Sequence, residues 1–398
     1  MIPETYINKY IIDRVDINNQ TFYLKNQTDT DLGFEIPFKI RLNGIVNDLP
    51  IFVDTTHSSE DYLIYRFINP YLNAQSDIFK IKEEDDGHAI GYIFSSYSLI
   101  DDDAEANEPF NEFKQAYKFY CIKNIISQHS WPDDLNIQTI SFSEIIESDS
   151  SYLVIHKPSV GNKFKFIEDY YPCLAIYGYF HYPLKANPQI VSFVKKDSDN
   201  SELENIIIAR YHVHRKKQSI KLRSSHSLMA ESHIAKLFYS QLLVEGDNPL
   251  YRFLVSYQII EYLIDREFKK GIDDIIEIKS ELTNFKFIQK INELYTPRTT
   301  IKKLFDKINF DDKNEIGNLL KSFLLEFIKD YDKIHIGDCF YDIRNLLFHD
   351  YKTVLEKNPD GSLTSLVIQC ELLIHHLVVS LVSKAKDKKE NQLKLNLY

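Results

Sequence analysis

The stretch that decides the fold, residues 338–350, has the sequence DCFYDIRNLLFHD. Its apolar residues recur every three or four positions, at Phe340, Ile343 and Leu347. At about 100° per residue these side chains form one stripe of an α-helix. A second face holds the polar residues, namely Asp342, Asn345 and His349. The stretch therefore predicts an amphipathic helix with one face in a core and one polar face.

The same helical periodicity continues through the carboxy-terminal part of the chain from about Ser227, where glycine is rare. It predicts helices near 228–243, 249–269, 282–294, 299–308, 313–331, 338–350 and 362–386. Residues 357–362, KNPDGS, indicate a turn between the last two helices. We expect a connecting helix over residues 226–244 and an all-α helical bundle over 245–398.

Residues 1–225 have a different composition, with short runs rich in Tyr, Phe, Ile and Val that are separated by Asn, Asp, Gly and Pro. Such runs predict β-strands, here Thr21–Leu24, Phe34–Leu42, Tyr62–Phe67, Ile90–Ser95, Tyr152–His156 and Ile206–His214. One helix is expected between about residues 111 and 127. The predicted fold class is α+β, an amino-terminal β-rich domain followed by the helical bundle.

Length and composition indicate a folded protein, since 398 residues with 44% hydrophobic content can build two cores. The four cysteines, Cys121, Cys173, Cys339 and Cys370, are far apart, which favours reduced, buried thiols over a disulfide framework or a zinc knuckle. The first ten residues lack the features of a secretion signal, so we expect a cytoplasmic protein. The apolar run Leu366–Val382 contains one carboxylate and two histidines, which favours a bundle helix over a membrane span.

The formal charge of −11 argues at first against a nucleic-acid partner. The charge is unevenly distributed, however. From Glu245 onward there are 23 Lys and Arg against 25 Asp and Glu, so −9 of the total belongs to residues 1–244. The excess acid therefore lies in the β-rich domain and not in the bundle.

Arg344 and His349 form the candidate catalytic pair. They are five residues apart, about 140° around a helix, so either the arginine must reach round to meet the imidazole or the helix must begin near Arg344. RNA is cleaved when its own 2′-hydroxyl attacks the adjacent phosphate, which requires a proton acceptor and compensation of phosphate charge. Histidine titrates near neutral pH and can exchange the proton, while arginine binds phosphate oxygens. Asn345 can orient the imidazole or bind a phosphate oxygen, and no metal is required.

The arrangement Arg-Asn-x-x-x-His at 344–349, late in a helical domain, resembles the Arg-polar-x-x-x-His signature of the HEPN superfamily of ribonucleases. The resemblance places Arg344, Asn345 and His349 at the family's catalytic positions, without a cofactor. It also implies a site built across a homodimer interface of the helical domain, and products with a 2′,3′-cyclic phosphate and a 5′-hydroxyl.

Two further features resemble HEPN proteins of prokaryotic antiphage defence. Residues 251–263, YRFLVSYQIIEYL, are similar to an early bundle helix of these proteins, and the preceding β-rich domain is similar to the ApeA-type arrangement. The resemblance implies a metal-independent endoribonuclease acting on RNA as a toxin or abortive-infection effector. Residues 1–225 would then sense a phage-derived or protein trigger or restrain the bundle. The alternative is a non-catalytic HEPN-like module that binds RNA, nucleotide or protein.

Glu261, an acidic residue on the helix predicted at 249–269, is a further candidate for the catalytic site, because it could orient Arg344 or His349 across the bundle. Glu261 and Asp265 are one helical turn apart, and ion pairing with Lys269 at the surface is the simpler interpretation.

Between Glu204 and Glu231 the chain has no acidic residue, and basic residues accumulate there. The candidate RNA-binding residues are Arg210, Arg215, Lys216, Lys217, Lys221 and Arg223. A solvated edge strand explains the same pattern. His212 and His214 lack a nearby carboxylate and predict no metal site, and His375 and His376 are expected in the core. The chain also lacks the glycine-rich phosphate loops and the His-Glu-x-x-His motif that would indicate a nucleotidase, a dinucleotide enzyme or a zinc protease.

Overall fold

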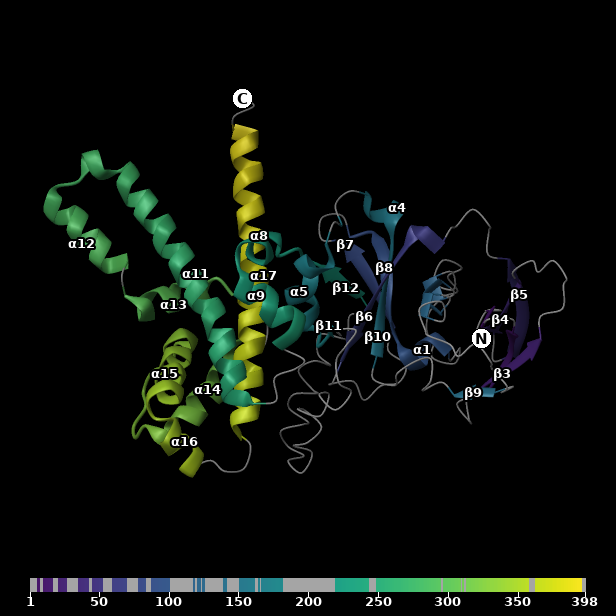
Figure 1. Ribbon diagram of the computed structural model, residues 1–398. Coiled ribbons are helices and arrows are strands. Elements are labelled where there is room, and N and C mark those ends of the chain that lie inside the picture. The colour runs from purple at the N-terminus through teal and green to yellow at the C-terminus, as the bar shows by residue number, and fades with distance from the viewer. Residues whose placement is uncertain are drawn as a thin grey trace. The chain divides into compact units, whose positions relative to one another are not determined.

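A computed structural model of the protein describes residues 6–7, 10–16, 21–26, 35–42, 45–52, 59–69, 78–83, 87–100, 117–118, 120–122, 124–125, 139–141, 150–161, 164, 166–181, 219–242, 248–294, 296–308, 310, 313–357 and 362–395. The chain divides into two compact units. The first comprises Met1–Lys165 and His214–Leu222, and the second comprises Phe166–Val213 and Arg223–Tyr398. Strands dominate the first unit and helices the second (Figure 1), which confirms the predicted α+β class.

A curled sheet forms the core of the first unit. Its strands β6 (Tyr62–Ile68), β10 (Ser150–His156), β8 (Ala89–Ser95), β7 (Ile78–Glu83) and β12 (Ser219–Leu222) lie side by side in this order. Neighbours are antiparallel except β7 and β12, which are parallel. The central strands β8 and β10 are buried along nearly their whole length, as their continuous apolar sequences predict. Gly91 is required on β8, because a Cβ there would collide with the Val154 carbonyl oxygen of β10.

Six further strands form two smaller sheets of the first unit. One is antiparallel, in the order β1 (Tyr6–Ile7), β2 (Tyr10–Asp16), β3 (Thr21–Asn26) and β9 (Thr139–Ser141). The other is the hairpin of β4 (Glu35–Leu42) and β5 (Ile45–Phe52). Two short helices, α1 (Ser96–Ile100) and α4 (Lys157–Val160), follow β8 and β10. Five of the six predicted strands are confirmed, and the sixth, Ile206–His214, lies outside the described residues.

The helical unit includes a segment that the sequence places in the β-rich domain. After the 3₁₀ turn η4 (Ile167–Tyr170), the helix α5 (Tyr171–Ile176) packs on the last helix of the chain, where Cys173 and Ile176 contact Val379. A two-residue strand, β11 (Phe180–His181), follows α5. The described residues between 117 and 125 are helical, as expected.

The connecting helix expected at 226–244 is present but divided into α8 (His226–Glu231), α9 (His233–Leu237) and a π-helical turn η6 (Phe238–Leu242). Ser232 causes the first break. Its backbone is extended, and its side chain accepts a hydrogen bond from the Ala235 amide at 3.2 Å. A serine that caps a new helix in this way ends the preceding one.

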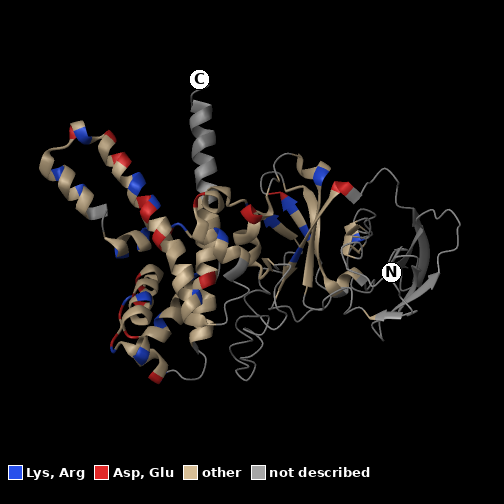
Figure 2. Ribbon diagram, in the orientation of Figure 1, with Lys and Arg blue, Asp and Glu red and all other residues tan. Residues whose placement is uncertain are grey.

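The bundle consists of α11 (Pro249–Glu277), η7 (Lys279–Glu281), α12 (Asn284–Leu294), α13 (Pro297–Asp306), α14 (Lys313–Phe327), α15 (Ile336–His349), α16 (Tyr351–Lys357) and α17 (Ser362–Leu395). Each predicted bundle helix has a counterpart, although α11 and α17 are longer than expected and α16 is an addition. The helix α11 packs on α17 and α13, and α15 packs on α13 and α14. Acidic and basic residues are interspersed along α11 and α12 (Figure 2).

The apolar part of α17 occupies the centre of the bundle. Leu363–Leu381 is long and apolar enough to cross a membrane, yet 89% of its most apolar 18-residue window is buried inside the protein. This burial agrees with the bundle helix that the sequence predicts. The four cysteines are buried and form no disulfide, also as predicted.

A buried ion pair joins α11 to α17. The Arg252 Nε donates to Glu371 Oε1 at 2.9 Å and Nη2 donates to Oε2 at 2.6 Å, with side chains only 4% and 3% exposed. Paired geometry of this kind satisfies both oxygens of the carboxylate, which a buried charge requires.

The two histidines of α17 are core residues, as predicted. His375 Nδ1 lies 3.0 Å from the Tyr239 hydroxyl, and the ring of His376 stacks on Phe310 with centroids 3.9 Å apart. Burial and, to a smaller extent, the nearby Arg252 guanidinium together lower the pKa of His375 to about 3. The imidazole of His375 is therefore neutral at physiological pH.

We expect Glu371→Gln to lower the free energy of unfolding by about 3–5 kcal/mol, because it leaves the Arg252 charge buried without its partner. Denaturant unfolding measures this loss. The double variant Arg252→Met/Glu371→Leu should recover most of it. A matched control is Lys352→Ala, since the Lys352–Glu356 pair on α16 is mostly solvent-exposed and should contribute nothing measurable. Equal effects of Glu371→Gln and Lys352→Ala would contradict the assigned role.

We expect His375→Gln to weaken the pH dependence of stability. The pKa of His375 is lower in the folded protein than in the unfolded chain. The stability that the neutral imidazole contributes is therefore complete above about pH 6.5 and is lost as pH falls toward 3. Between pH 6 and 4, the free energy of unfolding of the wild type should fall by up to about 1.4 kcal/mol per pH unit more than that of the variant. Denaturant unfolding at several pH values gives both curves, and parallel curves would show that His375 does not titrate as proposed.

Candidate active site

The helix α15 is fixed in place by carboxylates on its first two turns. Asp338 accepts a hydrogen bond from Arg298 Nε at 2.7 Å, and Asp342 accepts one from Arg298 Nη2 at 2.5 Å. Arg298 lies on α13, and Gly337 allows the close approach of the two helices. A Cβ at Gly337 would lie 2.9 Å from the Lys302 Cα. Lys302 Nζ of α13 also pairs with Asp338 Oδ2 at 2.9 Å, so the position of α15 relative to α13 is set by three ion pairs and one backbone contact.

Asp342 takes no part in the site, although the sequence places it on the same helix face as Asn345 and His349. Besides Arg298, it accepts hydrogen bonds from the Tyr331 hydroxyl at 2.9 Å and from Lys333 Nζ at 2.8 Å. All three donors bind the Oδ2 atom, so Asp342 is engaged in holding α15.

The structure brings Arg344 and His349 together. The Arg344 Nη1 lies 3.4 Å from His349 Nε2, at the exposed carboxy-terminal end of α15. The long arginine side chain reaches round the helix to span the five-residue separation. A guanidinium only donates, so in this contact Nε2 carries the lone pair and the Nδ1 the proton. The unprotonated Nε2 can accept a proton.

Aromatic rings and Asn345 hold the Arg344 guanidinium. Its carbon lies 4.5 Å from the centroid of the Phe348 ring and 5.3 Å from that of Tyr257 on α11. The Asn345 Oδ1 accepts a hydrogen bond from Nη1 at 3.1 Å. Asn345 therefore positions the arginine, whereas the sequence suggested contact with the imidazole or with phosphate. Cation–π contacts orient the charge and leave it a full positive charge for an anion.

Tyr257 is the buried part of this arrangement. Burial raises the pKa of its phenol to about 12, with Arg344 acting in the opposite direction and Glu261 adding to the increase. The hydroxyl is therefore protonated at neutral pH. It supplies a neutral donor and acceptor beside the arginine.

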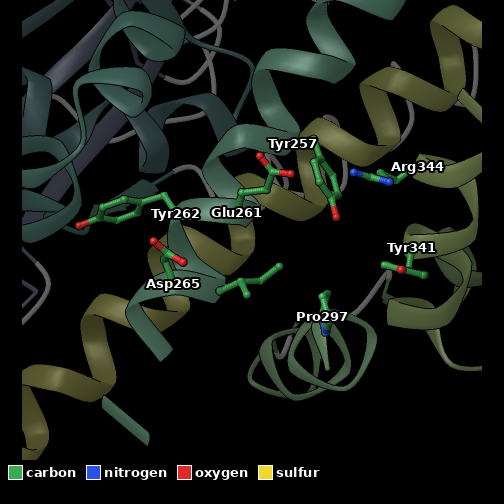
Figure 3. A pocket seen from close by; sticks show the side chains of 8 residues that line it. Tyr257, Glu261, Tyr262, Asp265, Pro297, Tyr341 and Arg344 are labelled. Carbon is green, nitrogen blue, oxygen red and sulfur yellow. The ribbon is translucent and has the colours of Figure 1, made fainter. Parts of the chain in front are cut away.

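A pocket of about 510 Å³ opens beside Arg344. Its lining comes from three helices and consists of Tyr257, Glu261, Tyr262, Ile264, Asp265, Pro297, Tyr341 and Arg344. Figure 3 shows the α11 residues on one side of the space, Tyr341 and Arg344 of α15 on the other, and Pro297 at the start of α13 below. The Tyr257 hydroxyl points into the space, while the Tyr262 ring points away from it.

Glu261 lines this pocket, but its expected part in orienting the pair has no contact to support it. Among the described residues it makes no hydrogen bond or ion pair with Arg344 or His349. The simpler interpretation, pairing with Lys269, is not observed among them either. Arg344 is the one cation that lines the pocket together with Glu261 and Asp265, and neither carboxylate forms an ion pair with it.

Most of the candidate RNA-binding residues lie in parts of the chain that the structure does not describe. Arg210, Arg215, Lys216 and Lys217 lie outside the described residues, as do His212 and His214. Lys221 is exposed on β12, and the exposed Arg223 follows the end of that strand. Within the described part of the chain, no group of three or more His, Cys, Asp or Glu side chains could hold a metal ion.

Four residues that support the site were not apparent from the sequence. Tyr257 and Phe348 pack on Arg344, Tyr341 lines the pocket, and Arg298 contacts the Tyr341 ring. The sequence carried a partial signal for Tyr257, since it lies one helical turn before Glu261 in the segment that resembles an early HEPN helix. For Arg298 and Tyr341 it carried none, because their roles depend on how α13 meets α15.

Comparison with family models, with curated proteins and with solved structures gave no match to this chain. Its function has to be inferred from the site's own residues.

Proposed function

We propose that the protein is a metal-independent endoribonuclease whose active site is formed by Arg344, Asn345 and His349. The observation that carries the proposal is the 3.4 Å approach of Arg344 Nη1 to His349 Nε2 at an exposed helix end. A permanent cation and a group that exchanges protons near neutral pH are what phosphodiester cleavage by an internal hydroxyl needs.

In the proposed reaction, His349 Nε2 accepts the proton of an RNA 2′-hydroxyl. The 2′-oxygen then bonds to phosphorus, and the bond from phosphorus to the 5′-oxygen breaks. The products are a 2′,3′-cyclic phosphate and, after the leaving oxygen takes a proton, a 5′-hydroxyl. Before this step the phosphate displaces the imidazole from Arg344, whose guanidinium then offsets the charge on the non-bridging oxygens. Asn345 and the two aromatic rings keep the guanidinium aligned.

A homodimer through the helical domain would complete this chemistry. A single histidine that has taken a proton in the attack must return it to the leaving oxygen, which departs on the opposite side of the phosphorus. A second imidazole from the other copy would supply that proton directly, and a twofold axis would pair the two sites.

The biological role that we propose is a cytoplasmic toxin or abortive-infection effector of antiphage defence. Support for it comes from the resemblance to HEPN proteins and from the order of a β-rich unit before a helical one. Residues 1–225 would sense a phage-derived or protein trigger, and the bundle would cut RNA.

We expect His349→Ala to reduce RNA cleavage by about 10²–10⁴-fold, the usual contribution of a general base, without changing the unfolding curve. The assay incubates RNA with the protein in EDTA, and end analysis should find cyclic phosphates. A matched control is His233→Ala, since His233 is exposed on α9 in the same unit and should be dispensable.

Undiminished cleavage by purified His349→Ala would remove the assignment. A gel shift of intact RNA by the wild type, with no fragments, would favour the alternative of a non-catalytic binding module.

We expect light scattering at micromolar concentration to give twice the mass of one chain, because the proposed proton donor comes from a second copy. Mixing wild type with an excess of His349→Ala should lower the activity of each wild-type chain as mixed dimers form. A strictly monomeric protein with full activity would contradict the dimeric site.

A further inference from the structure

The pocket beside Arg344 has no part in the cleavage chemistry described above. Its volume of about 510 Å³ falls within the range of sites that bind small ligands, about 300–1,000 Å³. Because Arg344 belongs both to the pocket lining and to the catalytic pair, a group in the pocket lies next to a phosphate held by that arginine.

The charges of the lining indicate which chemical group the pocket accepts. Glu261 and Asp265 contribute two carboxylates from successive turns of α11, and Arg344 is the one cation among the eight lining residues. No described residue forms an ion pair or hydrogen bond with either carboxylate. Such a lining repels a second phosphate and favours a neutral group that presents N–H donors, because ionised carboxylates only accept hydrogen bonds.

The remaining surface suits a flat ring. Tyr341 is half-buried. The guanidinium carbon of Arg298 lies 5.2 Å from the centroid of its ring, which restricts the orientation of the ring plane. Pro297 and Ile264 add apolar surface, and the Tyr257 hydroxyl points into the space. Nucleobases of single-stranded RNA are bound in this manner, by stacking on aromatic side chains and by hydrogen bonds to their edges.

We propose that this pocket binds the base adjacent to the cleaved phosphate and that its carboxylates select guanine. The inference rests on the proposed ribonuclease function, of which it specifies the substrate. Guanine presents two adjacent donors, N1–H and the N2 amino group, which match the two oxygens of one carboxylate. Adenine and cytosine present one amino group beside a ring acceptor. Uracil presents a single N–H between two carbonyl oxygens, which the carboxylates repel.

Glu261 is the residue that we assign to this recognition, with Asp265 as the second acceptor. A bidentate pair of this kind discriminates between bases by roughly tenfold or more. The preference should therefore appear as a ratio of kcat/KM values between substrates that differ in one base.

The test uses short RNAs that are 2′-O-methylated at every position but one, so that only a single linkage can be cut. The bases on both sides of that linkage are varied through all sixteen combinations. With the other base held constant, the wild type should cut substrates with guanine at the recognised position at least about tenfold faster than those with uracil there. In Glu261→Gln, which has the same shape but no charge, this ratio should fall toward one. Glu277→Gln provides the matched control, since Glu277 is exposed at the far end of α11 and should leave the ratio unchanged.

A wild-type ratio near one, or an equal ratio in Glu261→Gln and wild type, would overturn the inference while leaving the ribonuclease function intact. The two proposals are separated by measuring the binding of fully 2′-O-methylated dinucleotides, which cannot be cleaved, to wild type, His349→Ala and Glu261→Gln. Tighter binding of the guanine dinucleotides that depends on Glu261 and not on His349 supports the base site even if no RNA is cut. Equal binding of all dinucleotides, with no cleavage, would remove both proposals.

Discussion

The helical unit depends on the buried ion pair between Arg252 of α11 and Glu371 of α17. Charges removed from water are tolerated only when their geometry is nearly ideal, so this pair restricts how far α11 can rotate or slide against α17. Tyr257 and Glu261 follow Arg252 on the same helix. Fixing α11 therefore fixes the ring against which Arg344 packs and the carboxylate that faces the pocket.

The helix α15 meets two different surroundings along its length. Its amino-terminal half is tied to α13 and the preceding loop through Asp338 and Asp342, which together accept from Arg298, Lys302, Lys333 and Tyr331. Its carboxy-terminal end presents His349 to solvent, beside the half-buried Arg344. Two aromatic rings and Asn345 restrict the long arginine to one orientation, and no carboxylate in the described part of the chain pairs with it. The guanidinium stays available for an anion.

The candidate site was foreseeable in part. The pair of Arg344 and His349 was predicted from the chemistry of the two side chains and from the resemblance to the HEPN signature, whereas their spacing alone would put them on different parts of the helix surface. The sequence alone could not show that Asn345 binds the arginine. The Arg-Asn-x-x-x-His spacing is the same whether the Asn345 amide points toward Arg344, toward His349 or toward a phosphate. Asp342 was placed with the polar face, yet donors from α13 and from residues 331–333 engage it. The pocket was not foreseeable, because α11, α13 and α15 contribute to it from distant parts of the sequence.

The sequence by itself determined the α+β class, five of the predicted strands, the bundle helices, the buried cysteines and the core position of His375 and His376. These features follow from periodicity and from the cost of exposing apolar groups, which act over a few residues or on single side chains. Only the tertiary structure decided that residues 166–181 belong with the helical unit, that Arg252 pairs with Glu371, and that an acid-lined pocket lies beside Arg344. Each of these depends on contacts between helices distant in sequence, whose rotation and spacing are set by packing and by pairing of buried charges.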